Sequence, residues 1–336
     1  MPAEWEPHEA TWLAWPHERT DWPGKFAPIR WVYAEIVRHL ARREGVRILV
    51  QDQAEKEKAR RVLARAGADL DVVRFYVRTT NRGWLRDSGP IFVKDRRGRI
   101  AVTDWKFNAW ASYAEWRQDD RVPAFIARQL RLARWSTGLV LEGGSIDVNG
   151  RGALLTTEEC QLSPVQARNP GLSRRDLEAA FARFLGVRHV LWLGRGIAGD
   201  DTHGHVDDVA RFVDPVTVVT AVEDDASDPN HEPLRENLRR LRRMKDQDGR
   251  PLRVIVLPLP EPVYFGRQRL PASYMNFYIA NGVVLVPTFN DPADRVALNT
   301  LARLFPDRRV VGIYSRDLVL GLGAIHCLTQ QQPAAG

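Results

Sequence analysis

The sequence repeats one pattern five times: an amphipathic helical stretch is followed within a few residues by a short run of β-branched and apolar residues. Helices that lead directly into short apolar strands are typical of chains in which helices pack on sheets. We therefore predict an α/β fold along the whole chain. The helix and strand pairs are 29–43 with 46–50, 56–65 with 72–77, 174–185 with 187–193, 234–244 with 252–257, and 293–304 with 310–314.

The pattern is not a plain alternation of parallel strands. Residues 138–148 and 152–156 are predicted to be consecutive strands with no helix between them. No GxxxxGK[ST] occurs, which excludes the phosphate-loop signature of nucleotide-binding proteins. Residues 224–233, rich in Asp, Pro and Asn, are the best candidate for a long loop. One compact domain is favoured over two domains joined by a hinge.

Composition excludes several classes of protein. With 44% hydrophobic and 27% charged residues in 336, the chain is neither disordered nor collagen-like. No apolar run approaches the roughly 18 residues that span a bilayer. The N-terminal residues lack a basic start with an unbroken apolar segment, and the two cysteines are too few for a disulfide scaffold. We expect a cytoplasmic protein with reduced thiols.

The formal charge of +7 does not indicate a nucleic-acid partner. Most of the basic residues are arginines spread along the chain, and nucleic-acid binding would require a clustered basic face with interleaved aromatics or a known motif. We expect neither a nucleic-acid nor a membrane partner. The one basic cluster, predicted to lie on a solvated helix face, comprises Arg239, Arg240, Arg242 and Arg243.

Four segments place acids, a histidine and a thiol among glycines, which allow a backbone to turn sharply or approach a ligand. They are NRGWLRDSGP from residue 81, LEGGSID from 141, GDDTHGHVDD from 199 and GLGAIHCLTQQQP from 321. A guanidinium ion is planar and cationic, so carboxylates such as Asp87, Glu142 and Asp207 are its natural complement. Its delocalised carbon requires a strong nucleophile, and the thiolate of Cys327 is the best candidate.

His205 can transfer the protons that such a reaction requires, first to a departing nitrogen and later from water. His205 and Asp207 are two residues apart, so they point to the same face if the segment is a strand. His326 directly precedes Cys327, and strand neighbours point to opposite faces, so we expect a structural role for it. Cys160 lies in none of these glycine-flanked segments, and we expect a small buried hydrophobe.

Together with the opening AEWEPHEATWLAWP, and with GDDTHGHVDD continuing as VARF, these segments resemble the signature blocks of the agmatine deiminases. That family lies in the bacterial peptidylarginine deiminase-like branch of the guanidine-modifying superfamily. The resemblance extends to Gln331. It implies a five-bladed pseudo-fivefold α/β propeller of ββαβ units with the site in the central channel. It implies one catalytic domain over residues 1–332, followed by a short tail at 333–336.

The resemblance also implies a reaction: the hydrolysis of agmatine to N-carbamoylputrescine and ammonia, through a covalent amidino-thioether on Cys327 and without metal or organic cofactor. Such an enzyme serves polyamine biosynthesis or agmatine catabolism and forms a homodimer. The implied catalytic residues are Cys327 as nucleophile, His205 as acid and base, Glu142 holding His205 or a guanidinium nitrogen, and Asp87 and Asp207 gripping the guanidinium.

Two more residues are expected at the substrate. Trp84 is implied to lie along it, and Asp201 either contacts it or orders the loop before His203. The sequence departs from the family pattern at Leu322 and Ala324, which stand where the C-terminal block has a glycine and an asparagine. These departures affect the fit of the substrate near the thiol rather than the chemistry.

Three alternatives remain open from the sequence. The substrate could be free or peptidyl arginine instead of agmatine. His203, His205 and Asp207 resemble the HxHxD ligand strand of zinc hydrolases, although a second histidine-rich cluster is missing among eight scattered histidines. A guanidinium or polyamine binding module would use the carboxylates and tryptophans but would not need Cys327.

Overall fold

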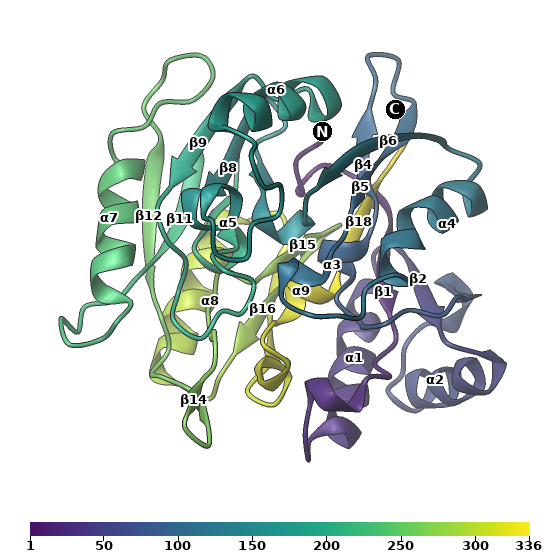
Figure 1. Cartoon of the computed structure of the whole chain (residues 1–336). Coiled ribbons are helices and arrows are strands. Elements are labelled where there is room, and N and C mark those ends of the chain that lie inside the picture. The colour runs from purple at the N-terminus through teal and green to yellow at the C-terminus, as the bar shows by residue number, and fades with distance from the viewer.

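The computed structural model describes all residues from 1 to 336 (Figure 1). It is a mixed α/β protein, as predicted. The strands are β1 (His8–Ala14), β2 (Gly45–Val50), β3 (Val73–Val77), β4 (Ile91–Lys94), β5 (Ile100–Lys106), β6 (Ala133–Val140), β7 (Asp147–Val148), β8 (Ala153–Thr157), β9 (His189–Leu193), β10 (Ala210–Phe212), β11 (Thr217–Val222), β12 (Arg253–Pro258), β13 (Tyr264–Phe265), β14 (Gln268–Arg269), β15 (Tyr278–Ala280), β16 (Val283–Thr288), β17 (Arg309–Tyr314) and β18 (Gln330–Pro333).

The α-helices are α1 (Phe26–Leu40), α2 (Gln53–Arg65), α3 (Leu85–Ser88), α4 (Val122–Gln129), α5 (Glu158–Leu162), α6 (Arg174–Leu185), α7 (His231–Leu241), α8 (Pro292–Leu304) and α9 (Ile325–Leu328). Two short 3₁₀ helices matter for the site, namely η5 (Gly143–Ser145) and η6 (Val206–Asp208).

Five of the six sheets share one strand arrangement. In four of them the middle strand is antiparallel to the strand before it and parallel to the strand after it, and a helix connects the parallel pair. These sheets are β4-β5-β6, β7-β8-β9, β10-β11-β12 and β15-β16-β17. The fifth joins the two ends of the chain, because β18 pairs antiparallel with β1, and β2 and β3 follow in parallel. Each sheet therefore begins with an antiparallel strand.

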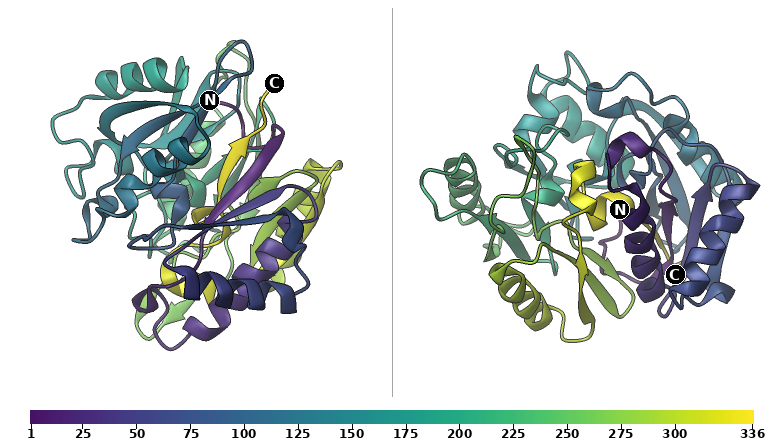
Figure 2. Two further views of the ribbon diagram at one scale, coloured as in Figure 1. Left: turned by 90° about the vertical axis from the view of Figure 1, so that its right-hand side faces the viewer. Right: turned by 90° about the horizontal axis from the view of Figure 1, so that it is seen from below.

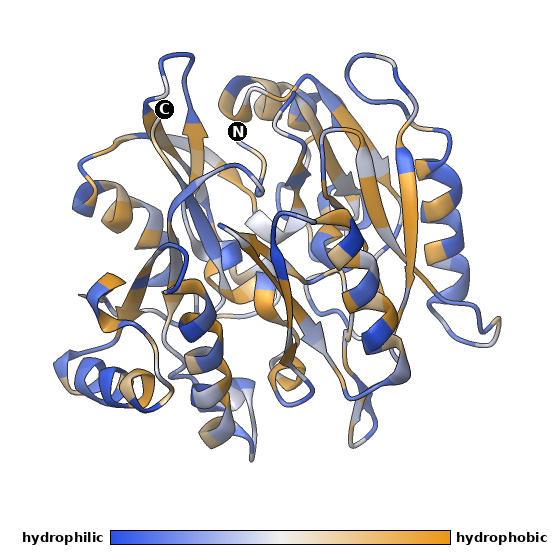
Figure 3. Ribbon diagram, turned by 180° about the vertical axis from the view of Figure 1, so that it is seen from behind, coloured by the Kyte–Doolittle hydropathy of each residue, from blue (hydrophilic) through white to orange (hydrophobic).

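The long helices lie toward the outside of the molecule and the strands lie inside them (Figure 2). The short helices α3 and α9 pack against each other near the centre (Figure 1). Apolar residues follow the strands, while most helices carry polar residues along part of their surface (Figure 3). A helix of this kind buries one stripe and leaves the other in water. None of the helices has the length and apolarity needed to cross a membrane.

All five predicted helix and strand pairs are present. The prediction for α6 is confirmed at both ends, because Ser173 and Asp176 form a capping box and Gly186 ends the helix in the left-handed conformation at φ 71°. Helix α7 begins at residue 231, so the end of the predicted loop 224–233 is helical. The predicted strand at 138–148 is wrong: the chain leaves β6 at residue 140 and passes through η5, because consecutive glycines disfavour a strand.

A network of buried charges joins segments that are far apart in the sequence. Glu4 receives a hydrogen bond from the backbone N–H of Ile279 at 2.8 Å and pairs with Arg211 at 2.9 Å and with Arg86 at 3.3 Å. Arg211 also pairs with Asp147 at 3.2 Å and is fully buried. Breaking a buried ion pair leaves an uncompensated charge in a low-dielectric interior.

We therefore expect Arg211→Met to lower the free energy of unfolding by about 3–5 kcal/mol, because Asp147 loses its counter-charge and Glu4 keeps only that of Arg86 among the arginines. Urea unfolding followed by circular dichroism measures the change. The matched control is Arg235→Met, because Arg235 forms an exposed pair with Glu232 on α7 and its loss should cost less than about 1 kcal/mol. Equal effects of the two substitutions would contradict the importance of the network.

Candidate active site

The predicted site residues converge although they come from distant parts of the chain. Each lies in a connecting segment directly before the first strand of a sheet. Asp87 is in α3 before β4, Glu142 precedes η5 and β7, His205 precedes η6 and β10, and Cys327 is in α9 before β18. Because the sheets repeat one arrangement, the same position in each brings its side chain toward the same region.

The convergence is visible in the distances between side-chain atoms. His205 Nδ1 lies 3.7 Å from Asp87 Oδ1 and 3.9 Å from Asp207 Oδ1, and its Nε2 lies 3.5 Å from Glu142 Oε2. Cys327 Sγ lies 3.8 Å from Asp207 Oδ2. All five side chains are buried, with 5% or less of each residue exposed. The structure thus brings the whole predicted set together.

Asp87 is held by two donors. Its Oδ2 accepts a hydrogen bond from Trp110 Nε1 at 2.9 Å, and its Oδ1 accepts one from the backbone N–H of Gly144 at 3.0 Å. Burial raises the pKa of Asp87 to about 6, with contributions from Asp207 and Glu142 that His205 partly offsets. The carboxyl group is therefore ready to ionise when a cation binds beside it.

Gly144 explains why the LEGGSID segment needs a glycine at its centre. A Cβ at this position would lie 2.6 Å from His205 Nδ1, 2.8 Å from Asp87 Oδ1 and 3.0 Å from Asp207 Oδ2. No side chain fits there, because these separations are shorter than non-bonded contacts allow. The absence of a side chain lets the backbone approach the acids and the imidazole closely.

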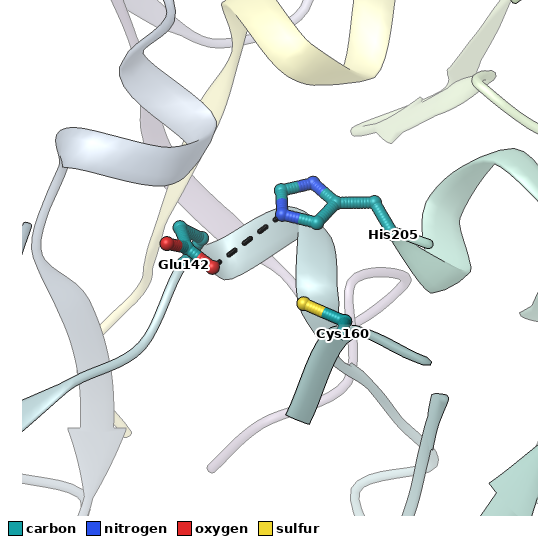
Figure 4. Close-up of side chains that lie close together, drawn as sticks. All are labelled: Glu142, Cys160 and His205. Carbon is teal, nitrogen blue, oxygen red and sulfur yellow. Dashed lines mark ion pairs between the residues drawn. The ribbon is translucent and has the colours of Figure 1, made fainter. Parts of the chain in front are cut away.

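His205 also borders a cluster that the sequence did not predict. Figure 4 shows its ring beside Glu142 and Cys160, and donor atoms of the three residues lie within 4.8 Å of one another. Glu142 in turn accepts hydrogen bonds from Arg168 Nε at 3.0 and 3.2 Å, with both side chains fully buried. Cys160 is buried as expected, but its thiol lies against the imidazole.

The charges in this cluster favour the imidazolium form of His205. Burial acts against a charge there, but the Asp87 carboxylate and the contacts with Cys160 and Glu142 outweigh it and hold the pKa of His205 well above its usual range. Burial also opposes ionisation of Glu142, but Arg168 and His205 keep the pKa of that carboxyl low. Neither ring nitrogen of His205 has a hydrogen-bond partner within the protein.

Asp207 is anchored on the side away from the imidazole. Its Oδ2 lies 2.7 Å from His326 Nδ1, and His326 Nε2 lies 2.7 Å from Glu4 Oε2. Burial opposes ionisation, but His326 keeps the pKa of Asp207 low. His326 therefore connects the site to the buried charge network. The contact agrees with the structural role expected for it, but α9 is a helix and not the strand assumed.

The thiol of Cys327 lies in strongly acidic surroundings. Burial and the carboxylates of Asp207, Asp208 and Asp87 raise its pKa well above its ordinary value, while the backbone N–H of Ala324 acts in the opposite direction. Desolvation and nearby negative charges both disfavour a thiolate. The resting cysteine is a neutral thiol until a cation offsets these carboxylates.

Cys327, Asp87, Trp84 and Asp201 line one cavity of about 310 Å³. Trp84 Nε1 donates a hydrogen bond to Asp21 at 3.1 Å, which holds the indole ring in the cavity wall. Asp201 Oδ2 accepts a hydrogen bond from the Tyr113 hydroxyl at 2.5 Å. Burial raises the pKa of Asp201 to about 6.

Leu322 also lines this cavity and has a left-handed backbone at φ 67°. Side chains other than glycine rarely adopt this conformation. The position that departs from the family pattern is thus one where the backbone favours glycine, and it carries an apolar side chain into the wall of the cavity that Cys327 also lines. Ala324 is buried and contributes its backbone N–H to Cys327, so its short side chain leaves that interaction in place.

The structure separates His203 from the other two residues of the zinc alternative, His205 and Asp207. The strand assumed around His205 is wrong, because that segment is irregular and continues into η6, although His205 Nδ1 and Asp207 Oδ1 still lie 3.9 Å apart. His203 Nε2 contacts Ser163 Oγ at 3.0 Å and lines a separate surface hollow. The donor atoms of Glu142, Cys160 and His205 have metal-ligand spacing, but a cation among them would lie beside the guanidinium of Arg168.

Sequence reasoning missed Arg168 and Trp110, which position Glu142 and Asp87. Neither residue lies near a glycine-rich segment, and buried arginines and tryptophans serve many structural roles. Their only signal in the sequence is their type, because each can donate a hydrogen bond to a carboxylate.

The chain is similar to known proteins along almost its whole length. The family model of the Porphyromonas-type peptidyl-arginine deiminases matches residues 1–333. The agmatine deiminase of Stutzerimonas stutzeri is 40% identical, with 99% of this chain and 95% of that protein covered. The structure of the Enterococcus faecalis agmatine deiminase superposes with a TM-score of 0.92 at 35% identity, covering 99% of this chain and 95% of that one.

A third relative has its substrate bound. This cysteine-to-serine variant of the C. jejuni agmatine deiminase superposes with a TM-score of 0.90 at 29% identity, covering 100% of this chain and 96% of that one. The chain belongs to the Porphyromonas-type peptidyl-arginine deiminase family. The family resemblance of its signature segments is confirmed.

We expect Gly144→Ala to lower the turnover rate of guanidino substrates at least about a hundredfold, because a methyl group would displace His205 and Asp87 from their reacting positions. Ammonia release measures the effect. The matched control is Gly194→Ala, where a Cβ would make an ordinary contact at 3.4 Å. If Gly144→Ala kept wild-type activity, the close approach at this glycine would not matter for the site.

Proposed function

We propose that this chain is an agmatine deiminase, which hydrolyses agmatine to N-carbamoylputrescine and ammonia. One observation carries the proposal: the buried thiol of Cys327 lies 3.8 Å from the Asp207 carboxylate, which also adjoins the imidazole of His205, and neither nitrogen of that ring has a hydrogen-bond partner within the protein. Planar cations with several N–H donors match such an arrangement. Curated relatives about 40% identical over nearly the whole chain support the same activity.

In our proposal the acids hold the substrate and the thiol attacks it. Asp87 and Asp207 accept hydrogen bonds from the guanidinium nitrogens, and Trp84 packs along the alkyl chain. Asp207 Oδ1 is buried and has no hydrogen-bond partner within the protein, which suits it to receive a guanidinium N–H. The bound cation offsets the carboxylates around Cys327, so the thiol releases its proton to solvent and the thiolate attacks the guanidinium carbon.

The first half of the reaction releases ammonia. Addition of the thiolate to the guanidinium gives a neutral tetrahedral intermediate. His205, protonated at rest, donates its proton to one nitrogen, and the carbon–nitrogen bond breaks with loss of ammonia. A cationic amidino-thioether remains on Cys327, and His205 is left neutral. Glu142, itself held by Arg168, orients the imidazole during both transfers.

The second half returns the enzyme to its starting state. Neutral His205 takes a proton from water, and the hydroxide adds to the amidino-thioether carbon. The carbon–sulfur bond then breaks and releases the Cys327 thiolate together with the protonated ureido product, which returns a proton to the thiolate and restores the neutral thiol. The ammonia of the first half takes up the proton that the thiol had released to solvent. Agmatine and water give N-carbamoylputrescine and an ammonium ion.

The cavity favours agmatine over free arginine. Agmatine carries a second cation in place of the arginine carboxylate. Among the charged residues that line the cavity, Asp87, Asp201 and Asp21 are acids, and the one base, Arg82, is ion-paired with Asp21. A carboxylate on the substrate would meet no unpaired cation there. In our proposal Asp201 belongs to the substrate-binding residues.

Three further properties belong to the same proposal. The five sheets that share one strand order are five ββαβ blades around a pseudo-fivefold axis, with the site in the central channel. Residues 1–332 form one catalytic domain and 333–336 a short tail. The chain forms a homodimer, an expectation that rests on the family resemblance.

Ammonia and ureido-product release from agmatine, arginine and a blocked peptidyl-arginine, assayed in parallel, tests the function. We expect turnover of agmatine, unaffected by a chelator and absent in Cys327→Ala. Cys327→Ala should still bind agmatine, because the carboxylates remain. Turnover lost to the chelator would favour a metal mechanism, and binding without turnover by the wild type would favour a binding module.

The dependence of the thiol on the substrate cation can be measured directly. The thiolate absorbs near 240 nm, and subtraction of the Cys327→Ala titration removes the contribution of Cys160. Because the folded-state pKa of Cys327 is raised, the thiolate should form only at alkaline pH in the free enzyme. A saturating guanidinium analogue that is not turned over should lower that pKa by a unit or more. An unmoved pKa would contradict activation by the substrate.

A further inference from the structure

One of the five similar sheets contributes none of the site residues that were predicted from the sequence. Four of the five similar sheets place Asp87, Glu142, His205 or Cys327 directly before their first strand. The remaining sheet, β15-β16-β17, begins at residue 278, and the polar residue in the equivalent position is Asn276. This asparagine is fully buried. The repeated arrangement therefore points Asn276 toward the same region as the other four.

The orientation of the Asn276 amide follows from its partners. Its Oδ1 accepts hydrogen bonds from the backbone N–H groups of His326 at 2.9 Å and of Cys327 at 3.3 Å. Backbone N–H groups can only donate, so the atom that faces them is the oxygen. The Nδ2 group therefore faces the other way.

On that side Nδ2 meets three acceptors, of which the two nearest are Asp208 and the sulfur. Cys327 Sγ lies 3.1 Å away and Asp208 Oδ1 lies 3.0 Å away, while Asp207 Oδ2 is more distant at 3.4 Å. The amide has two N–H bonds. One N–H directed at Asp208 fixes the plane of the group and leaves the other directed at the sulfur.

The sulfur needs such a donor because its other neighbours oppose a negative charge. The titratable groups that face it from the packed elements are Asp87 of α3, Asp207 and Asp208 of η6, and the Tyr33 hydroxyl of α1, with His326 bound to Asp207. Hydrogen bonding to a charged form stabilises that form. Apart from the backbone N–H of Ala324, Asn276 supplies the donor contact to the sulfur.

We propose that Asn276 is a further catalytic residue, which donates a hydrogen bond from Nδ2 to the thiolate of Cys327. Its Oδ1 holds the start of α9, the helix that carries Cys327. The inference rests on the proposed role of Cys327 as nucleophile. The bond stabilises the thiolate twice, when it forms before attack and when it leaves the ureido product. It also fixes the position of the sulfur, because the same side chain accepts a hydrogen bond from the backbone N–H of Cys327.

The test separates the donor from the support of the backbone. Asn276→Asp keeps an oxygen for the two backbone N–H groups and, when ionised, has no donor for the sulfur. Asn276→Leu removes both functions at similar volume. Titration of the thiolate absorbance and the rate of Cys327 alkylation by iodoacetamide, followed by mass spectrometry, are measured for each variant without substrate. We expect both substitutions to raise the thiol pKa by a unit or more and to slow alkylation at pH 8 at least tenfold.

The matched control is Asn237→Asp, because Asn237 is also fully buried but bonds Gly194 and Arg195 away from the thiol. It should leave the thiol pKa unchanged. A wild-type thiol pKa in Asn276→Asp would overturn the proposal and leave only a supporting role. If Asn276→Leu fails to fold, Asn276→Asp decides alone.

A second readout links the inference to catalysis. We expect kcat for agmatine to fall roughly a hundredfold in Asn276→Asp, comparable to removal of one donor to a developing anion. Agmatine affinity should persist when Asn276→Leu is combined with Cys327→Ala, because the gripping carboxylates remain; its loss would indicate a structural role. If the wild type does not turn over agmatine, the proposed function is refuted. The thiol titration still tests whether Asn276 donates a hydrogen bond to the Cys327 thiolate.

Discussion

The structure depends on a set of buried charges that hold one another in place. Glu4, near the N-terminus, binds Arg211 in β10, Arg86 next to Asp87, and His326 next to Cys327. Each of these charges would be costly alone in the interior, and each is tolerable because the others neutralise it. The network therefore requires all the segments to dock together. It also fixes the sequence neighbours of two site residues, because Arg86 precedes Asp87 and His326 precedes Cys327.

Pairing between opposite charges also sets the protonation state of each site residue. Arg168 keeps Glu142 ionised and His326 keeps Asp207 ionised, while Asp87, without a comparable cationic partner, has a pKa of about 6. The acids in turn keep the imidazole of His205 protonated and the thiol of Cys327 neutral. Such a site is poised for a cation: its arrival satisfies the acids and removes the reason for the thiol to stay protonated. Reactivity thus depends on occupancy and not on the cysteine alone.

Much of the fold and of the site could be predicted because the relevant signals are local. Helix α6 was predictable at both ends, since Ser173 and Gly186 act within a few residues of the helix they cap. The glycine-flanked acids Asp87 and Glu142 stood out for a similar reason. The errors arose where local pattern was ambiguous. The HVD segment has the alternation of a strand, but the chain turns there to reach β10, and the two glycines after Glu142 interrupt the strand predicted at 138–148.

The sequence by itself determined the α/β class, the family and the residues able to do the chemistry, because helix periods, caps and motifs are written in neighbouring positions. Only the tertiary structure decided which other groups contact the site residues. Arg168, Cys160 and Asn276 lie far from Cys327 along the chain and carry no motif, yet they bind Glu142, adjoin His205 or touch the sulfur. Their positions follow from sheets that repeat one arrangement and direct the same connecting segment inward. Contacts of that kind depend on packing between distant elements, which no local pattern encodes.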